Sequence, residues 1–220
     1  MGIRLYWGSG SPFAWRVMLT LEVKGIAYES KLLEFSKGEH KAADYLRLNP
    51  RGKVPTLQED DFVLYESLAI MMYLDRRNPE PPIFGRTPQE AGLIWQSISE
   101  TESYLVDAAN KLVRPIFFGK GLDKIEELQQ AAETIRQEFK TLDERLTRSR
   151  WLVADQLSAA DISVFPVIQL ILRAADKETA EPLNLMLLPL SRTYPHMASW
   201  IQRIEALPGY ERTYPPHWRT

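Results

Sequence analysis

The sequence predicts two domains of different class, an α+β domain over residues 1–80 and an all-α domain over residues 88–220. Up to about residue 80, hydrophobic periodicity changes repeatedly between strand-like alternation and helical spacing, whereas beyond residue 88 only helical spacing is found. A proline-rich stretch, Pro79-Glu80-Pro81-Pro82, separates the two patterns. Such a stretch is typical of a stiff linker between domains.

The first domain begins with a strand, a helix and a second strand. Residues 3–7 alternate in polarity as a strand does, and Gly8-Ser9-Gly10 ends them. Ser11-Pro12 opens a helix that runs to Lys24-Gly25, with proline suited to the first helical position and glycine to the residue after the last. Residues 26–33 form the second strand. A helical crossover between two strands of one sheet makes them parallel.

The rest of the first domain is predicted to hold a short helix, a hairpin and a third helix. The short helix ends near Asn49-Pro50. Two apolar runs at residues 54–57 and 62–65 flank an acidic turn and predict the hairpin. The third helix starts at Glu66-Ser67 and stops near Asn78-Pro79.

The second domain is predicted to contain long helices only. Residues 89–118 form one candidate, with Leu93 and Tyr104 among the residues of its apolar side. Pro115 is expected to end or kink this helix, because proline removes a backbone donor. Residues 125–146 form the next candidate, whose apolar residues are spaced three and four apart along a single stripe.

Residues 158–173 are apolar around the whole helix axis and predict the buried centre of the second domain. Ser158 and Asp161 fit an aspartate variant of the capping box, in which each side chain bonds to the other residue's backbone N–H. Replacing Asp161 by alanine is therefore predicted to cost about 0.5–2 kcal/mol of stability.

The composition restricts the chemistry that the protein can perform. Lys and Arg total 27 against 29 Asp and Glu, a net charge of −2, which does not favour a nucleic acid or an anionic membrane as partner. The sequence contains no cysteine, so the protein has no thiol nucleophile and no thiolate metal ligand of its own. Any thiol chemistry must use a thiol that the substrate brings.

Metal binding and membrane insertion are not expected. The three histidines, His40, His196 and His217, do not have the spacing of metal ligands. There is no secretory signal pattern, and no apolar stretch approaches the roughly 18 residues needed for a membrane span. We therefore expect a soluble cytoplasmic protein without a metal.

Several motifs occur in the order found in glutathione transferases: a strand, a Ser-Pro helix, NPRGKVPTL, LYESLAI and SAADISVFP. The sequence resembles that family over nearly its whole length. LYWGSGSP, WRVM, KLLEFSKGEHK and NPRG, with PPHW near the end, are similar to the rho class, with theta, zeta and tau kinship among the serine-type groups. The resemblance implies a thioredoxin-like first domain that binds glutathione, a helical domain that supplies the pocket for an electrophile, and a homodimer.

The same resemblance assigns the contacts to glutathione. Val54-Pro55 matches a cis-proline turn, where the backbone of Val54 pairs with the cysteinyl unit like an added strand. Glu66 and Ser67 match the pair that holds the γ-glutamyl ammonium and carboxylate. The contacts to the glycine carboxylate fall on Lys53, His40 and Lys41. Each set also has a purely structural interpretation. Val54-Pro55 can be the end of an edge strand, Glu66 and Ser67 can be a helix cap, and the three basic residues can form a solvated basic face.

Ser11 is the residue to which the resemblance assigns activation of the thiol. A free thiol has a pKa of about 8.5, and a hydroxyl donor at the positive end of a helix can lower that pKa by about one to two units. Alternatively, Ser11 only caps the helix, or Ser9 is the donor. Arg16 can add positive charge to the site or pair with an acidic residue.

Rho-like relatives carry a cysteine before WRV, where this chain has Ser11-Pro12-Phe13-Ala14, so mixed-disulfide chemistry is excluded. The electrophile pocket is expected to be apolar and aromatic. Its candidate residues are Phe13, Tyr104, Phe117, Phe118 and Trp218, although aromatic residues at helical spacing more often belong to a core.

The predicted function is that of a detoxifying glutathione S-transferase, which conjugates the glutathione thiolate to hydrophobic electrophiles. A glutathione-dependent isomerase or dehalogenase, and a non-catalytic protein that binds glutathione or hydrophobic ligands, are the alternatives.

Overall fold

The computed structural model describes residues 2–119 and 121–219, which form two compact units. The first unit comprises the chain up to Ile83 together with the segment from Ala206 onward, and the second is Phe84–Glu205. The sequence placed all residues after 88 in the helical domain. The structure instead groups the C-terminal segment with the first unit, because its aromatic residues pack against the first helix of the chain.

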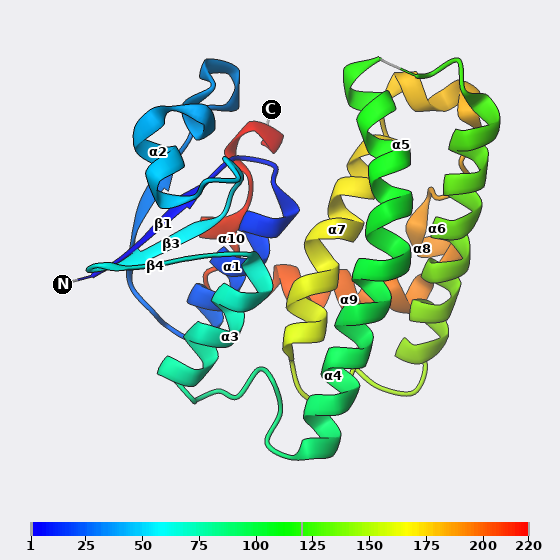
Figure 1. Cartoon of the computed structure of the whole chain (residues 1–220). Coiled ribbons are helices and arrows are strands. Elements are labelled where there is room, and N and C mark those ends of the chain that lie inside the picture. Colours follow the sequence, from blue (N-terminus) through cyan, green and yellow to red (C-terminus); the bar gives the residue numbers. More distant parts are fainter. Residues whose placement is uncertain (1, 120, 220) are drawn as a thin grey trace. The chain divides into compact units, whose positions relative to one another are not determined.

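The first unit is a four-stranded mixed sheet with helices packed on it (Figure 1). Its main elements are β1 (Ile3–Trp7), α1 (Pro12–Val23), β2 (Tyr28–Leu32), α2 (Ala43–Leu48), β3 (Thr56–Glu59), β4 (Phe62–Tyr65), α3 (Ser67–Arg77) and α10 (Tyr210–Thr213). Short 3-10 helices span Phe35–Lys37, Glu39–Lys41 and Pro216–Trp218. The strand order is β2-β1-β3-β4, with β1 parallel to β2 and antiparallel to β3, and with β4 antiparallel to β3. The predicted crossover and hairpin are confirmed.

Helix α1 is the buried centre of the first unit. All residues from Ala14 to Leu21 are buried, including the polar Arg16 and Thr20. On α1, the indole of Trp15 donates to the hydroxyl of Thr213 at 2.9 Å, and α10 lies beside α1 (Figure 1). The C-terminal segment therefore completes the core around α1.

The end of α1 is fixed by a buried ion pair. The ammonium of Lys24 lies 2.7 Å from Oδ1 of Asp75 on α3. The same ammonium donates to the carbonyl oxygens of Asn78 and Pro81, each at 2.7 Å. Three acceptors match the three N–H groups of an ammonium, so the buried charge is fully compensated. This network joins α1 to the end of α3.

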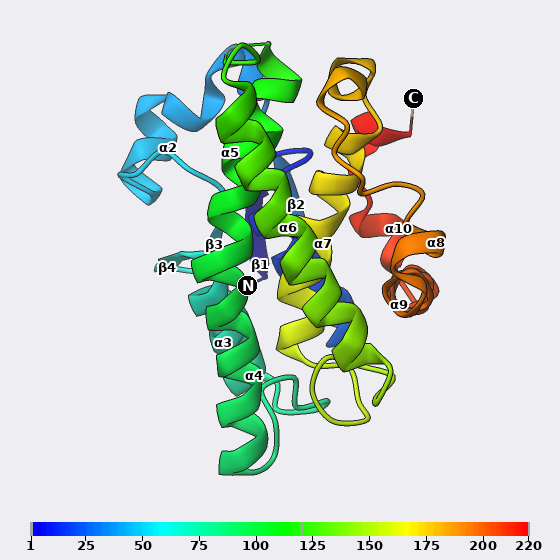
Figure 2. The same ribbon diagram turned by 90° about the vertical axis from the view of Figure 1, so that its right-hand side faces the viewer.

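Among its described residues the second unit contains helices and no strand. They are α4 (Pro88–Glu100), a π-helical stretch (Thr101–Leu105), α5 (Val106–Phe118), α6 (Ile125–Leu146), α7 (Ala159–Ala175), a 3-10 helix (Glu178–Leu183), α8 (Leu190–Thr193) and α9 (Pro195–Glu205). Within this unit α4 and α5 form one long helix, with α6 and α7 packed beside it (Figures 1 and 2). In the part of the chain that the structure describes, no helix is both long enough and apolar enough to cross a membrane.

The long helix differs from its prediction in two ways. Pro115 lies inside α5, and the helix continues to Phe118, where Gly119 with φ 69° ends it. Leu93 and Tyr104 are 54% and 57% exposed, so their assignment to the buried side was wrong. Each precedes a buried residue by one position, and one position is a rotation of about 100° around a helix. The periodicity located the stripe but not its edges.

The predicted stripe on α6 is buried except at its first residue. Ile125, the first residue of α6, is 52% exposed. The buried members of the predicted stripe are Leu128, Ala132, Ile135, Phe139, Leu142 and Leu146.

The predicted capping box at the start of α7 is present, with Ser158 as the N-cap residue. Asp161 is fully buried and accepts from the backbone N–H of Ser158 at 3.0 Å. Beyond the box, Asp161 accepts from the backbone N–H of Leu152 and from the indole N–H of Trp200, both at 2.9 Å. One carboxylate therefore joins a loop, the start of α7 and α9.

We predict that Asp161→Ala lowers the free energy of unfolding by about 3 kcal/mol or more, above the range expected for a cap alone, since several buried donors lose their acceptor. Urea denaturation measures the change. The control is Asp155→Ala, an exposed aspartate of the preceding loop, expected to change stability by less than about 0.5 kcal/mol. A loss confined to the capping range would show that the contacts with Leu152 and Trp200 add little.

Candidate active site

The turn between β1 and α1 positions Ser11. The backbone N–H of Ser11 donates to the carbonyl of Gly8 at 3.1 Å, which closes a four-residue turn. Gly10, the third residue of the turn, has φ 80°, as a type II turn requires. Ser11 then takes an extended conformation (φ −77°, ψ 116°) and caps α1, with Pro12 as the first helical residue. The predicted local structure is confirmed.

The cap leaves the hydroxyl proton of Ser11 available. The side-chain oxygen accepts from the backbone N–H of Ala14 at 3.3 Å. A serine hydroxyl has one proton to donate and two lone pairs that accept, so the cap uses a lone pair and not the proton. Capping α1 and donating a hydrogen bond to an anion are therefore compatible roles for Ser11, and the structure does not require a choice between them.

Arg16 and Ser67 connect the starts of two helices. Arg16 is only 3% exposed, and its Nε donates to Oγ of Ser67 at 2.8 Å. Its guanidinium also lies 4.9 Å from the centroid of the Phe13 ring, within the range of a cation–π contact. Ser67 is the first residue of α3 and is buried. Its hydroxyl, like that of Ser11, accepts one bond and keeps its proton for another partner.

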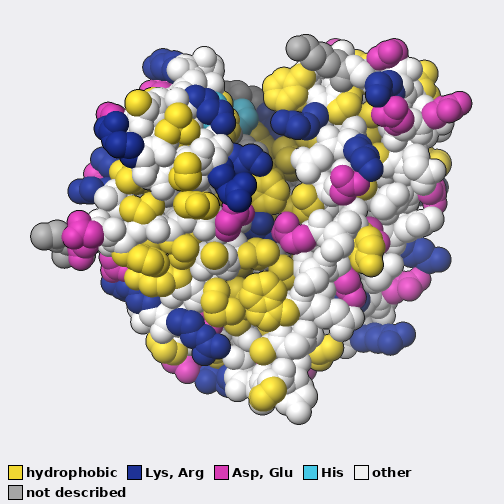
Figure 3. Space-filling model, viewed as in Figure 1, with side chains coloured by type: hydrophobic (Ala, Val, Ile, Leu, Met, Phe, Trp, Pro, Cys, Tyr) yellow, Lys and Arg dark blue, Asp and Glu magenta, His cyan; other side chains and the backbone are white. Residues whose placement is uncertain are grey.

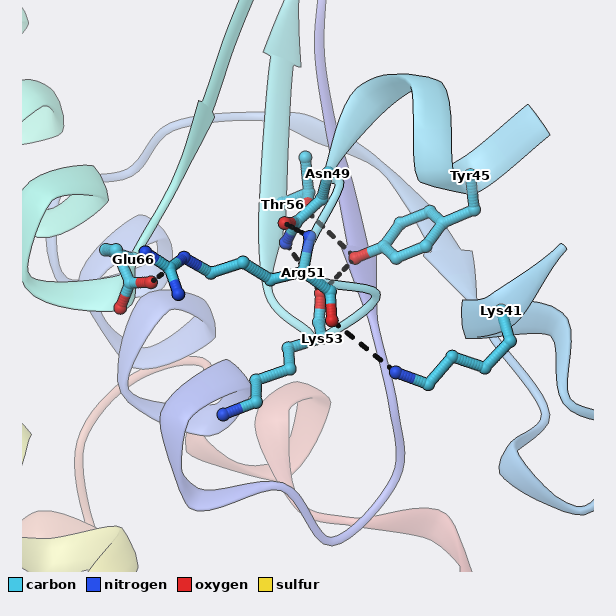
Figure 4. A network of polar contacts seen from close by, with 7 residues as sticks. All are labelled: Lys41, Tyr45, Asn49, Arg51, Lys53, Thr56 and Glu66. Atoms are coloured by element: carbon cyan, nitrogen blue, oxygen red, sulfur yellow. Dashed lines mark hydrogen bonds and ion pairs between the residues drawn. The ribbon is translucent and has the colours of Figure 1, made fainter. Parts of the chain in front are cut away.

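Glu66 has an unusual backbone conformation immediately before α3. Its φ is 71° and its ψ is 111°, a region that costs a residue other than glycine about 1–3 kcal/mol. Its side chain is exposed, with Oε1 3.7 Å from Nε of Arg51, and the two side chains face each other in Figure 4. The conformation places an exposed carboxylate directly beside the free N–H groups of the α3 N-terminus.

The Val54-Pro55 peptide bond is cis, as the resemblance implies. Thr56 then begins β3, which pairs with both β1 and β4. No backbone hydrogen bond links Val54 to another residue among those described. The backbone N–H and C=O of Val54 are therefore available to a ligand at the end of a sheet strand.

Two side chains, one on α2 and one at its C-terminal cap, hold the loop that precedes Val54 (Figure 4). The buried amide of Asn49 donates to the carbonyl of Lys53 at 2.8 Å and to the hydroxyl of Thr56 at 3.1 Å, and it accepts from the backbone N–H of Arg51 at 3.1 Å. The hydroxyl of Tyr45 lies 2.5 Å from the same carbonyl and 2.8 Å from the Thr56 hydroxyl. Burial raises the pKa of Tyr45, which keeps the phenol protonated as a donor.

The three predicted glycine-carboxylate contacts have different surroundings. The ammonium of Lys41 donates to the carbonyl of Gly52 at 2.8 Å, so this lysine supports the loop. Gly52 has φ 56°, and a Cβ there would lie 2.8 Å from that ammonium, so the position requires glycine. Lys53 is exposed and forms no ion pair with the described residues. Nδ1 of His40 is buried without a hydrogen-bond partner in the described chain.

The predicted pocket aromatics divide between the two units. In the first unit Phe13 is half-buried, and Trp218 is 8% exposed with its ring 5.4 Å from that of Trp15, so Trp218 is largely a core residue. In the second unit Phe117 is half-buried, and Phe118 is 73% exposed. Tyr104 lines a cleft of about 630 Å³ together with residues of α5 and α6.

Lys, Arg, Asp and Glu side chains are interspersed on the face shown in Figure 3, consistent with the near-neutral net charge. Within residues 2–119 and 121–219, no group of three or more His, Asp or Glu side chains could hold a metal ion. The candidate polar groups of the first unit are hydroxyls, backbone groups and single charges. This set suits a flexible peptide-like ligand with charged ends.

A thioredoxin-like unit with a serine at the first helix start, followed by a helical unit, defines the class of the glutathione transferases. The family described as "Glutathione S-transferase, N-terminal domain" matches residues 10–77, and "Glutathione S-transferase, C-terminal domain" matches residues 94–208. The chain belongs to the glutathione S-transferase family, and it is an enzyme of that class.

Individual relatives support this assignment over the whole chain. Glutathione S-transferase A of Pleuronectes platessa is 31% identical over 97% of this chain and 92% of its own length. Glutathione S-transferase 1 of Dianthus caryophyllus is 32% identical over 93% of this chain and 94% of its own. A crystal structure of a glutathione S-transferase from the Antarctic clam Laternula elliptica superposes with a TM-score of 0.84, at 30% identity over 100% of this chain and 94% of that one. A structure of glutathione S-transferase-I bound with lactoylglutathione has a TM-score of 0.78 and 26% identity, and it covers 97% of this chain and 98% of that one.

Sequence reasoning missed the side chains that hold the Val54 loop. Tyr45 of α2 and Asn49, the residue that caps the end of α2, carry out this role, and Arg51 pairs with Glu66 across the loop. The NPRG stretch carried a signal, because asparagine, proline and glycine within four residues mark a loop, and an asparagine side chain in a loop often bonds to the backbone. Their partners, Lys53 and Thr56, cannot be assigned from the sequence spacing.

We predict that Asn49→Ala destabilises the protein by about 1–3 kcal/mol, because the carbonyl of Lys53, the hydroxyl of Thr56 and the N–H of Arg51 all lose a buried partner. It should also raise the Kd for glutathione, since the loop carries Val54. Thermal unfolding and calorimetry measure the two effects. Arg47→Ala, at an exposed position of the preceding helix α2, is the matched control. Wild-type stability of Asn49→Ala would refute the proposed support of the loop.

Proposed function

We propose that the first unit binds glutathione through groups at the N-termini of α1 and α3 and in the loop around Val54. The γ-glutamyl carboxylate binds Ser67 and the free N–H groups of α3, and its ammonium binds Glu66. The buried Arg16, 2.8 Å from Ser67 by its Nε, supports this assignment because it fixes the orientation of the Ser67 hydroxyl. A relative of known structure was obtained with a glutathione derivative bound, which is consistent with this ligand class.

The cysteinyl unit pairs with the backbone of Val54, and the glycine carboxylate binds Lys53 with His40. The exposed ammonium of Lys53, which pairs with no carboxylate among the described residues, supports this placement. Lys41 contributes less directly, because its ammonium already bonds to the carbonyl of Gly52. With the peptide held at both ends, its thiol is directed toward the start of α1.

Ser11 activates the thiol by donating its hydroxyl proton to the sulfur anion. The single observation that carries this step is that the cap of α1 occupies a lone pair of Ser11 and leaves its proton free. The hydroxyl bond and the helix end stabilise the thiolate, and the thiol proton leaves to solvent. Arg16 acts by ordering Ser67 and by adding positive charge to the same helix.

The thiolate then attacks an electrophilic carbon of a hydrophobic compound. With an aryl halide, a carbon–sulfur bond forms, the carbon–halogen bond breaks, and halide leaves. The electrophile contacts are proposed for Phe13, Tyr104, Phe117, Phe118 and, at its exposed edge, Trp218. Detoxification of such compounds in the cytoplasm by a homodimer is the corresponding physiological role.

We predict that Ser11→Ala raises the pKa of the bound glutathione thiol by about one unit and lowers turnover of an aryl halide by about tenfold at neutral pH, with the affinity for glutathione largely preserved. A donor that stabilises the thiolate lowers the pKa of the thiol. Removal of the donor therefore lowers turnover most at pH values below the raised thiol pKa of the variant, and least at pH values above it. Ultraviolet titration of the thiolate and the pH profile of kcat measure both effects. Unchanged turnover would exclude Ser11 as the activating group.

The same assays separate the alternative functions. Faster isomerisation of a maleyl compound than conjugation of any electrophile would identify an isomerase, and faster release of halide from aliphatic halides would identify a dehalogenase. Tight binding of glutathione without turnover would identify a binding protein. Calorimetry that detects no association with glutathione at millimolar concentration would refute the proposed ligand.

We predict that the protein sediments as a homodimer of 25.4 kDa chains and that Leu93→Glu converts it to a monomer. Leu93 and Trp95 of α4 are 54% and 37% exposed, and symmetric dimers bury such apolar groups in a self-complementary interface. Gln89→Glu, an exposed substitution on the same helix, should leave the dimer intact. A monomeric wild-type protein in analytical ultracentrifugation would refute the proposal.

A further inference from the structure

The C-terminal segment reaches the turn that carries Ser11. The last short helix, Pro216–Trp218, places the ring of His217 against Gly10. A Cβ added to Gly10 would lie 2.7 Å from Cε1 of His217. The turn and the imidazole are therefore in direct contact within the first unit, and Gly10 makes room for the ring.

Both ring nitrogens of His217 have defined partners. The indole Nε1 of Trp218 lies 3.1 Å from Nε2 of His217. An indole nitrogen only donates, so Nε2 must accept, and the neutral ring then carries its proton on Nδ1. Nδ1 lies 2.5 Å from Oγ of Ser9. The assignment of the proton follows from the network: the imidazole donates to Ser9.

The direction of this hydrogen bond decides what Ser9 can do. The oxygen of Ser9 accepts from His217, so the hydroxyl proton of Ser9 points to a different partner. Ser9 is the second residue of the turn that Ser11 ends. The turn therefore carries two serine hydroxyls, each of which uses a lone pair for structure and keeps its proton for a further bond.

We propose that His217 is a positioning residue, which holds the Ser9 hydroxyl as a second donor to the sulfur anion beside Ser11. The inference rests on the proposed function, since it assumes that a thiolate forms at this turn. Under this proposal Ser9 and Ser11 are not alternatives, because both donate a hydrogen bond to the sulfur anion. Ser11 donates from the start of the helix, and Ser9 donates from the turn.

The C-terminal segment is anchored independently of His217. Trp218 packs edge-on against Trp15 with ring centroids 5.4 Å apart. Thr213 accepts from the Trp15 indole at 2.9 Å. Because these contacts do not involve the imidazole, a substitution at His217 should leave the segment in place. Such a substitution therefore tests whether His217 positions Ser9, and it does not test how the segment is attached.

The experiment compares His217→Ala with His217→Asn. Both variants remove the acceptor of the Trp218 indole, so both should lose a small amount of thermal stability. Only asparagine retains an N–H group near the position of Nδ1 that can donate to Ser9. His196→Ala, an exposed histidine of α9 in the second unit, is the control and should behave as wild type.

We expect His217→Ala to raise the pKa of the bound glutathione thiol and to lower kcat about threefold or more at neutral pH, with KM for glutathione changed less than about twofold. His217→Asn should recover most of this loss. Ser9→Ala should reproduce the effect of His217→Ala, and the double variant should be no worse than Ser9→Ala alone, because both changes remove one donor.

Three results would overturn the inference: a thiol pKa unchanged in His217→Ala, equal losses in His217→Ala and His217→Asn, or fully additive losses with Ser9→Ala. These results differ from failure of the proposed function. If the wild-type protein does not bind or ionise glutathione, the proposed function fails first. If it does both and the His217 variants match it, only the positioning role is lost.

Discussion

The buried guanidinium of Arg16 is the interaction on which the candidate site depends. A charge removed from water must be hydrogen-bonded, and here Nε is bonded to Ser67 at 2.8 Å. Because Arg16 lies on α1 and Ser67 starts α3, the two helix starts are held in one arrangement. Ser67 and the start of α1, the groups proposed to bind and to activate the peptide, are therefore linked through Arg16, and the ion pair between Lys24 and Asp75 joins α1 to α3 at the other end of α1.

The site uses each polar side chain in two ways. The oxygen of Ser11 accepts from Ala14 and the oxygen of Ser67 accepts from Arg16, while each keeps its proton for a ligand. Structural and functional interpretations of these residues therefore do not exclude each other, because a hydroxyl has separate donor and acceptor capacity. The loop before Val54 follows a different principle: Tyr45 of α2 and Asn49, which caps α2, both donate to the carbonyl of Lys53 and leave the Val54 backbone open.

Prediction from the sequence succeeded where the determining contacts are local. The capping box at Ser158 and the turn that leads into α1 involve residues within a few positions of each other, so residue type and spacing were sufficient. It failed at Leu93 and Tyr104, which lie at the edge of the buried stripe. Whether such a position is covered depends on the neighbouring helices, and periodicity within one helix carries no information about them.

The sequence by itself determined the two-domain class, the order of strands and helices, the family, and the absence of a thiol belonging to the protein. These properties follow from local spacing and from composition. Only the tertiary structure decided that Arg16 bonds to Ser67, that Asn49 and Tyr45 hold the Val54 loop, and that His217 reaches Ser9. Arg16 and Ser67 lie on different helices, and Ser9 and His217 are 208 positions apart in the sequence. The His217–Ser9 contact depends on the packing of the C-terminal segment on α1, and no spacing within one element encodes it.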